Sequence, residues 1–197
     1  MNENSSLQCT AFEGNRRIAS GALASVVRKV KEFSDRDPQA SVLIFDDVTS
    51  EVVEVDFRGS PDDVLKRLEK PAPEPEKQDP NAPRGPGRPK LGVVSREVTL
   101  LPRHWDWLNS QPGGASVALR KLVEEARRMH SGRDKVRGAQ ESAYRFMSAM
   151  AGNLPGFEEA TRALFAGNRT RFDECVASWP VDVRDHARML SDVALKS

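Results

Sequence analysis

The sequence lacks the features that define several common classes of protein. Its two cysteines and three histidines are far apart, so their spacing indicates neither a metal site nor a disulfide framework. The isolated thiols Cys9 and Cys175 suit a reducing cytoplasm. No apolar run approaches the roughly 20 residues of a membrane-spanning helix, and residues 1–6 lack the basic and apolar regions of a secretory signal. We therefore expect a cytoplasmic protein.

The chain also has little net charge, but the charge that it has is unevenly distributed. The formal net charge is +1. Residues 84–137 hold 12 Lys and Arg against five Asp and Glu, whereas residues 1–83 hold 11 against 16 and residues 138–197 hold seven against eight. A local excess of positive charge is typical of a nucleic-acid-binding segment. The alternative is a pair of helices with basic last turns, which the helix dipole favours.

A proline- and glycine-rich segment opens this basic region, with Arg84, Arg88 and Lys90 as its long side chains. Prolines fix φ and glycines carry no side chain, so the segment is predicted to be narrow and extended. Its core, Gly87-Arg88-Pro89, resembles the AT-hook, which implies insertion of Arg88 into an A·T-rich minor groove. Pro86 stands where the fuller hook has arginine, so we expect weaker binding. The alternative is a linker with solubilising charges.

The hook-like segment leads into a pattern of one strand and two helices. Residues 93–101 form a strand-like run, and helical segments over 103–109 and 116–128 flank a glycine-rich turn. Ser116 suits the N-cap of the second helix, whose apolar residues share one face: Leu119, Leu122, Val123 and Ala126. Such a segment cannot bury a core alone, so we expect a symmetric second copy to complete it. Two antiparallel strands would form a ribbon that fits a major groove.

This order of elements resembles the ribbon-helix-helix family of bacterial repressors. The second helix of that family reads Ser-x-x-Ile-Arg-x-Ala, and residues 116–122 match it at Ser116, Leu119 and Arg120. The resemblance implies that Ser95, Glu97 and Thr99 face DNA and that the Ser116 backbone N–H meets a phosphate. It also implies a dimer core made of Val98, Leu100, Leu108, Leu119, Leu122 and Val123.

Two strand positions depart from that family. Glu97 stands where the family usually has a basic or amide side chain, and Arg96 falls on the inward face. A glutamate can accept a hydrogen bond from cytosine N4, but it also repels phosphate. With the opposite strand phase, Arg96 and Val98 would face the groove instead.

The flanking regions predict an α+β protein. Residues 7–70 are expected to form a small module that begins with strands at 7–12 and 16–20. A helix follows, with an apolar face made of Leu23, Val26, Val27, Val30 and Phe33. The module continues with a hairpin from 41–45 and 52–57 and ends with a helix from Ser60-Pro61 to about Lys70. Residues 71–92 are proline-rich and charged, so we expect a disordered linker that carries the hook. After the 93–130 DNA-binding segment, residues 139–196 are predicted to be helical, with breaks at Pro155-Gly156 and Trp179-Pro180.

Three stretches of the chain resemble a family of bacterial proteins known only as a domain of unknown function. They are Leu-Leu-Pro-Arg-His-Trp-Asp-Trp-Leu over 100–108, Gln-Pro-Gly-Gly-Ala-Ser over 111–116 and Trp-Pro-Val-Asp-Val-Arg over 179–184. The resemblance extends from about Cys9 onward. It implies a bacterial protein and brings no activity with it.

The sequence therefore favours a non-enzymatic homodimer that binds double-stranded DNA, as a transcriptional regulator or a nucleoid-associated factor, with no cofactor and no metal. One alternative is a protein-interaction or structural module whose helices dimerise without DNA. Another is an enzyme whose site is assembled from distant residues. The carboxylates of Asp46, Asp47, Glu51, Glu54 and Asp56 are interpreted as turn and exposed-face residues, because nothing in their spacing fixes a ligand number or geometry.

Overall fold

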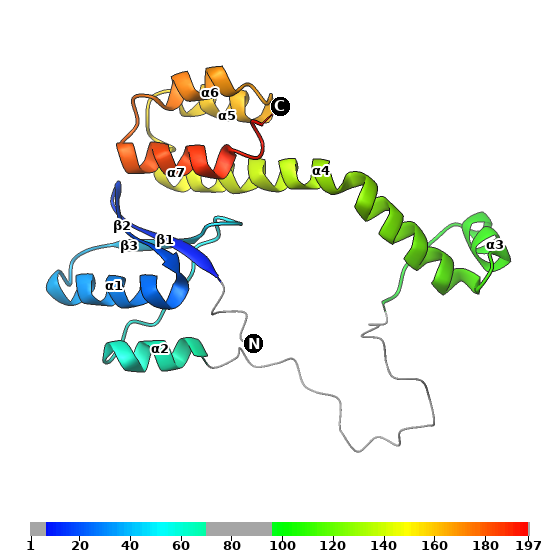
Figure 1. Cartoon of the computed structure of the whole chain (residues 1–197), viewed down its shortest axis with the longest axis horizontal. Helices are drawn as coiled ribbons and strands as arrows, with labels where there is room; N and C mark the ends of the chain where they lie inside the picture. Colours follow the sequence, from blue (N-terminus) through cyan, green and yellow to red (C-terminus); the bar gives the residue numbers. More distant parts are fainter. Residues whose placement is uncertain (1–6, 70–95, 197) are drawn as a thin grey trace, which may run out of the picture. The chain divides into compact units, whose positions relative to one another are not determined.

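The computed structural model describes residues 7–69 and 96–196 (Figure 1). Its elements are strands β1 (Gln8–Glu13), β2 (Arg16–Ala22) and β3 (Val42–Asp46) and helices α1 (Leu23–Arg36), α2 (Pro61–Glu69), α3 (Pro102–Ser110), α4 (Gly114–Ala151), α5 (Phe157–Phe165), α6 (Arg169–Val176) and α7 (Val181–Ser191). The protein is α+β, as predicted. None of the helices in the described residues has the length and apolar character of a membrane span.

The chain folds into two compact units, and each is described by itself. One, here called the core unit, comprises residues 1–72 and 132–197. The other, the helix-pair unit, comprises residues 73–131. Helix α4 contributes its first part to the helix-pair unit and its last part to the core unit.

The core unit is built on an antiparallel sheet in the order β2-β1-β3. β1 and β2 form a tight hairpin whose turn includes Gly14, with a positive φ of 53° that a glycine adopts without strain. Side chains alternate along β1, so that Cys9 and Ala11 lie on one face of the sheet and Phe12 lies on the other. The sheet therefore needs to be covered on both faces.

Helix α1 covers the first face of the sheet. Its buried residues Leu23, Val26, Val27 and Val30 pack with Cys9, Ala11, Ala19 and Ile44, and Val64 of α2 joins the same cluster. The predicted apolar face of this helix is confirmed, with Phe33 half-buried at its end. An amphipathic helix is stable here because its apolar stripe is removed from water against the sheet.

The second face of the sheet packs on α4 and α7, on the opposite side from α1 (Figure 1). The ring of Phe146 lies with its centroid 5.4 Å from that of Phe12 and 5.3 Å from that of Phe45. Residues 7–70 and 139–196, which the sequence presents as two modules, thus share one core. Alternation along a strand shows that both faces carry apolar side chains, but it does not show what covers them.

The predicted hairpin between 41–45 and 52–57 is formed only next to its turn, where Asp46 N–H donates to the Glu51 carbonyl at 3.0 Å and Val53 N–H donates to the Ile44 carbonyl at 2.8 Å. β3 pairs with β1, and Val52 forms only an isolated bridge to Phe45. The Asp46 carboxylate accepts hydrogen bonds from the backbone N–H groups of Val48 at 2.6 Å and Thr49 at 2.7 Å. This local turn, which ends at Ser50 with φ of 55°, returns the chain beside β3 for a single bridge, and residues 53–57 do not continue as a strand.

The predicted start of α2 is confirmed. The Ser60 hydroxyl accepts a hydrogen bond from Asp63 N–H at 3.3 Å, and the Asp63 carboxylate accepts from Ser60 N–H at 3.0 Å. This reciprocal pair satisfies two backbone N–H donors near the start of the helix. Pro61 at the first position has no backbone N–H and therefore needs no acceptor. The hydrogen bonds from Ser60 also lower the pKa of the Asp63 carboxyl.

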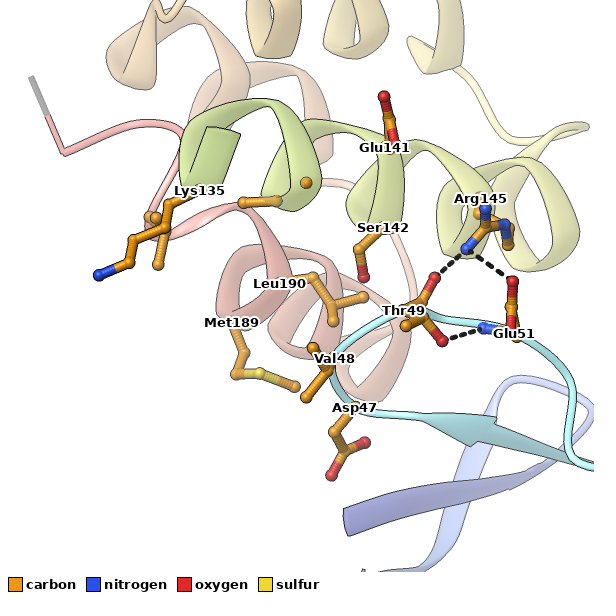
Figure 2. A pocket seen from close by; sticks show the side chains of 13 residues that line it. Asp47, Val48, Thr49, Glu51, Lys135, Glu141, Ser142, Arg145, Met189 and Leu190 are labelled. Carbon is orange, nitrogen blue, oxygen red and sulfur yellow. Dashed lines mark hydrogen bonds and ion pairs between the residues drawn. The ribbon is translucent and has the colours of Figure 1, made fainter. Parts of the chain in front are cut away.

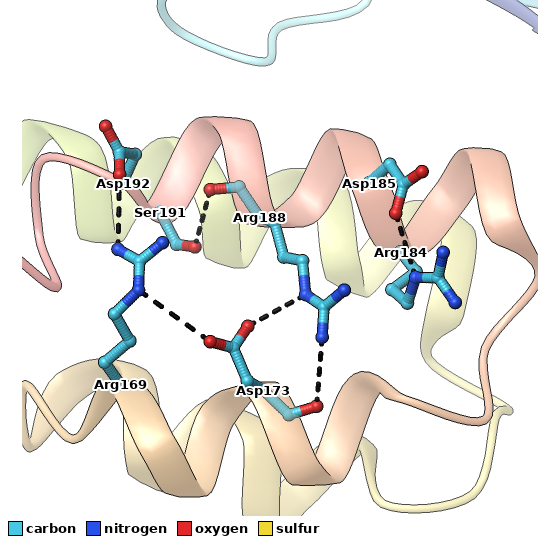
Figure 3. Close-up of polar contacts among 7 residues, drawn as sticks. All are labelled: Arg169, Asp173, Arg184, Asp185, Arg188, Ser191 and Asp192. Atoms are coloured by element: carbon cyan, nitrogen blue, oxygen red, sulfur yellow. Dashed lines mark hydrogen bonds and ion pairs between the residues drawn. The ribbon is translucent and has the colours of Figure 1, made fainter.

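Helices α5 to α7 complete the core unit. Between α6 and α7, the Asp173 carboxylate accepts a hydrogen bond from Arg188 Nε at 2.8 Å and lies 3.7 Å from Arg169 Nε (Figure 3). Arg169 also reaches Asp192 at 3.2 Å. The indole N–H of buried Trp179 donates to the Pro155 carbonyl at 2.9 Å. The breaks predicted at Pro155 and Pro180 lie between helices, as expected.

The helix-pair unit contains α3 and the first part of α4. Pro102 begins α3, where its missing N–H is not needed. Helix α4 begins at Gly114 and runs to Ala151, so two predictions are wrong: Ser116 lies within the first turn and is not the N-cap, and the helix does not end near 128. Gly113 and Gly114, both with positive φ, form the turn and set the start of the helix earlier.

The described part of the predicted 93–101 strand is not formed in the single chain. Residues 96–101 carry no strand, and residues 93–95 lie outside the described residues. A strand needs a partner edge, and the one that the sequence analysis expects belongs to a second copy. The ribbon therefore stays a prediction.

Because Phe146 packs on both phenylalanines of the sheet, Phe146→Ala should lower the free energy of unfolding by about 3–5 kcal/mol. Phe165→Ala is the control, since Phe165 is 51% exposed and should cost about 1 kcal/mol or less. Urea denaturation followed by circular dichroism measures both. Equal losses in the two variants would contradict the shared core.

Candidate functional site

Six of the predicted DNA-contacting residues lie outside the part of the chain that the structure describes. They are Arg84, Gly87, Arg88, Pro89, Lys90 and Ser95. The other three are described. Glu97 and Thr99 are exposed, and Ser116 is exposed in the first turn of α4, where backbone N–H groups have no partner within the helix.

The predicted dimer residues differ widely in exposure. Leu108 is buried, Leu100 and Leu119 are half-buried, and Val98, Leu122 and Val123 are exposed. Sequence reasoning missed further exposed apolar residues on the same unit: Leu101, Trp107 and Met129. Among the described residues of this unit, Leu108 and Ala118 are the only fully buried apolar side chains. The helix pair thus leaves most of its apolar surface in water.

The arginines of α4 are partly engaged within the helix. Arg127 pairs with the Glu124 carboxylate at 3.2 Å, and Arg120 Nε donates to the Ser116 carbonyl at 3.1 Å. Both arginine side chains are exposed. Exposed pairs of this kind contribute little to stability, so the guanidinium groups remain able to exchange partners.

The core unit holds a buried polar cluster that sequence reasoning did not find. Thr10 Oγ1 donates to Asp47 Oδ1 at 2.7 Å. The hydroxyls of Ser50 and Ser142, 92 residues apart in the sequence, share a buried hydrogen bond of 2.8 Å. This bond joins the turn after β3 to α4. No spacing signal could have found it, because the two serines meet only through the fold.

His186 is the most unusual member of this region. Its side chain is 1% exposed, and its Nε2 lies 4.0 Å from Asp47 Oδ1 without a hydrogen-bond partner in the structure. Burial, with a smaller contribution from the charge of Arg17, lowers the pKa of His186 to about 4. His186 is therefore neutral at pH 7, and its approach to Asp47 is not a salt bridge. Burial also raises the pKa of the Asp47 carboxyl.

The arrangement does not resemble a nucleophilic or metal centre. Burial, with the nearby charges of Asp46 and Asp47, raises the pKa of the Cys9 thiol to about 12, so the thiolate that attacks substrates is not populated. Within residues 7–69 and 96–196, no three His, Cys, Asp or Glu side chains gather as metal ligands would. The predicted acidic cluster is accordingly dispersed, with Asp46 capping a turn and Asp56 paired with Arg58.

An open groove of about 610 Å³ lies beside this cluster. It is bordered by the turn after β3, by α4 and by α7, and Figure 2 shows Val48, Met189 and Leu190 from two of these segments facing the same space. Arg145 closes one end, where its guanidinium donates to the Thr49 carbonyl and lies 4.0 Å from Glu51. The groove is mainly apolar with charged residues at its border.

A comparison with protein families identifies one match. Residues 8–191 match the family DUF2239, described as an uncharacterised protein conserved in bacteria. The chain belongs to this family. Comparisons with curated proteins and with solved structures find no match. The family membership agrees with the resemblance that residues 100–116 and 179–184 carry.

The buried histidine predicts a pH dependence of stability. Between about pH 6.5 and pH 4, the unfolded chain binds a proton at His186 that the folded protein excludes. The free energy of unfolding should therefore fall as the pH decreases through this range, by up to about 3 kcal/mol. His186→Phe should abolish this fall, because the ring still packs on Phe12 and Phe146 but no longer titrates.

Urea denaturation at several pH values between 7.5 and 5 measures the slope, and the difference between the wild type and His186→Phe isolates the contribution of His186. His104→Phe, at an exposed position of α3, is the control and should keep the slope of the wild type. A slope that His186→Phe leaves unchanged would assign the effect to another group.

Proposed function

We propose that the chain is a non-enzymatic homodimer that binds double-stranded DNA, as a transcriptional regulator or a nucleoid-associated factor in the bacterial cytoplasm. The observation that carries the proposal is the exposed apolar surface of the helix-pair unit. Trp107 is 52%, Val123 58% and Met129 67% exposed. Helices that bury so little alone are stabilised by a partner surface.

A second copy is the partner that the sequence pattern favours. In the ribbon-helix-helix arrangement, Val98 and Leu100 pair across a two-stranded ribbon and Leu119, Leu122 and Val123 pack between the two copies. Three of these positions are exposed in the single chain, and a partner would cover them: Val98, Leu122 and Val123. Residues 96–101 have no strand partner within the described chain, which leaves their backbone groups free to pair with a symmetric copy.

DNA is the ligand that the charge distribution favours. Residues 84–137 carry an excess of seven positive charges, and they include the hook-like Gly87-Arg88-Pro89. The first turn of α4, in which Ser116 is exposed, would offer backbone N–H groups to a phosphate. Exposed arginines on the same helix add attraction that does not depend on base sequence.

A protein-interaction module that dimerises without DNA is the alternative, because the same apolar surface would suit it. Glu124 neutralises Arg127, which lowers the positive charge that α4 presents. The two functions differ in one accessible property. A DNA-binding protein copurifies with nucleic acid that high salt removes, whereas the module does not.

Leu122→Glu tests the assembly. Leu122 is 43% exposed in the single chain, so the substitution leaves the fold of one copy intact but places an unpaired charge in the proposed interface. Dimerisation, measured by sedimentation, and DNA binding should be lost together, with a cost of several kcal/mol. The control is Val136→Glu, at a 37% exposed position of the same helix. A wild-type monomer at high concentration would contradict the proposal.

Arg88→Ala combined with Lys90→Ala tests the hook. Each lost phosphate contact should lower the slope of log K against log salt concentration by about 0.9, so binding to A·T-rich duplex DNA should weaken and depend less on salt. Fluorescence anisotropy at several salt concentrations measures both. The melting temperature should not change. An unchanged affinity for A·T-rich DNA would contradict the proposed minor-groove contact. It would not bear on the proposed ribbon, which Leu122→Glu tests.

A further inference from the structure

Several exposed apolar side chains line the groove of the core unit. Val48 is 74%, Met189 48% and Val193 48% exposed, and all three border the same space. They come from the turn after β3 and from the end of α7 and the residues after it. Its volume of about 610 Å³ lies within the range of small-molecule sites, roughly 300–1,000 Å³.

The carboxylates at the border of the groove have partners within the protein, whereas one of the cations, Lys135, has none among the described residues. Each of the three carboxylates has a partner: Asp47 accepts from Thr10, Glu51 lies 4.0 Å from Arg145, and Glu141 lies 4.0 Å from Arg137. Lys135 takes part in no ion pair with any of the described residues. Figure 2 shows Lys135 at the opposite end of the groove from Arg145, while Glu141 points away from Val48 and Met189.

We propose that this groove binds an organic anion with an apolar body, such as a medium-chain carboxylate. The aliphatic part would lie on Val48, Met189 and Leu190, and the carboxylate would meet the ammonium of Lys135. Burying the apolar body removes exposed side chains from water, which is favourable by roughly 25 cal/mol per Å². The cation selects an anion over a neutral molecule of the same size.

Binding has a structural consequence for α4. Residues 131–138 are exposed on every side, and Gly132 and Gly138 interrupt this stretch of helix with residues of low helix propensity. Lys135 and Gly138 nevertheless border the groove. A ligand that packs along them would shield this exposed stretch from water, so amide hydrogen exchange over 132–139 should slow when the site is filled.

The chain offers a direct probe, because it has only five methionines. Met189 borders the groove, Met147 lies in the buried core, and Met129 is 67% exposed on the other unit. In the full-length protein labelled with ¹³C at the methionine methyl groups, octanoate should shift the Met189 signal to saturation. The signals of Met147 and Met129 should stay in place. No DNA is present, so the result is independent of the proposed function.

Two variants separate charge from apolar contact. Lys135→Gln should weaken octanoate binding about two- to five-fold and leave 1-octanol binding unchanged, as expected for one exposed cation. Val48→Asp should weaken both ligands. Lys29→Gln on α1 and Val52→Asp just outside the groove are the matched controls. An unmoved Met147 signal shows in each variant that the core is intact.

Three results would overturn the site. The first is a Met189 shift that grows linearly without saturation. The second is an equal shift at Met129, which would mean that octanoate only coats exposed apolar surface. The third is a Lys135→Gln variant that binds octanoate as the wild type does while the Met147 signal is unchanged.

Discussion

The contact of Phe146 with Phe12 and Phe45 is the interaction on which the core unit depends. A three-stranded sheet with one helical layer on a single face would leave Phe12 and Phe45 in water, at a cost of roughly 1.5–3 kcal/mol for each side chain. The last part of α4 and α7 remove that cost. Once they are docked on the sheet, the turn after β3 lies against α4, where Ser50 and Ser142 can share their buried hydrogen bond. The groove exists only because this docking brings three segments together.

Docking also explains why His186 tolerates an environment that a histidine usually avoids. Its ring lies 4.5 Å from the Phe146 ring and 5.4 Å from the Phe12 ring, measured between centroids, so it fills the same aromatic cluster. A buried polar atom without a partner costs free energy, about 1–3 kcal/mol. The packing of the ring offsets that cost as long as the imidazole stays neutral, which its lowered pKa ensures at pH 7. The core is thus stable at pH values at which the histidine stays neutral.

Local signals in the sequence predicted the elements that depend on local physics. The capping pair of Ser60 and Asp63, the apolar face of α1 and the breaks at Pro155 and Pro180 are all determined within a few residues. The hairpin over 41–57 is formed only at the bridge between Phe45 and Val52, although the turn that Asp46 stabilises does return the chain beside β3. The groove and the Ser50–Ser142 bond were beyond reach, since they join residues about 90 positions apart. For the proposed DNA-binding segment the limit is different: its predicted partner is a second copy, and no single chain can display that pairing.

Helix α4 places the two units under a common constraint. A helix that is exposed on all sides is stable only if its ends are anchored, because isolated helical segments of this length are marginal in water. One end of the 131–138 stretch is anchored by Ala143, Phe146 and Met147, which are fully buried. The other end belongs to a helix pair with very few buried side chains among its described residues. Any association that buries Leu122 and Val123 would therefore strengthen the weak end, and any ligand along Lys135 and Gly138 would strengthen the middle. The first event would stabilise the part of α4 that belongs to the helix-pair unit, and the second would stabilise the part that belongs to the core unit.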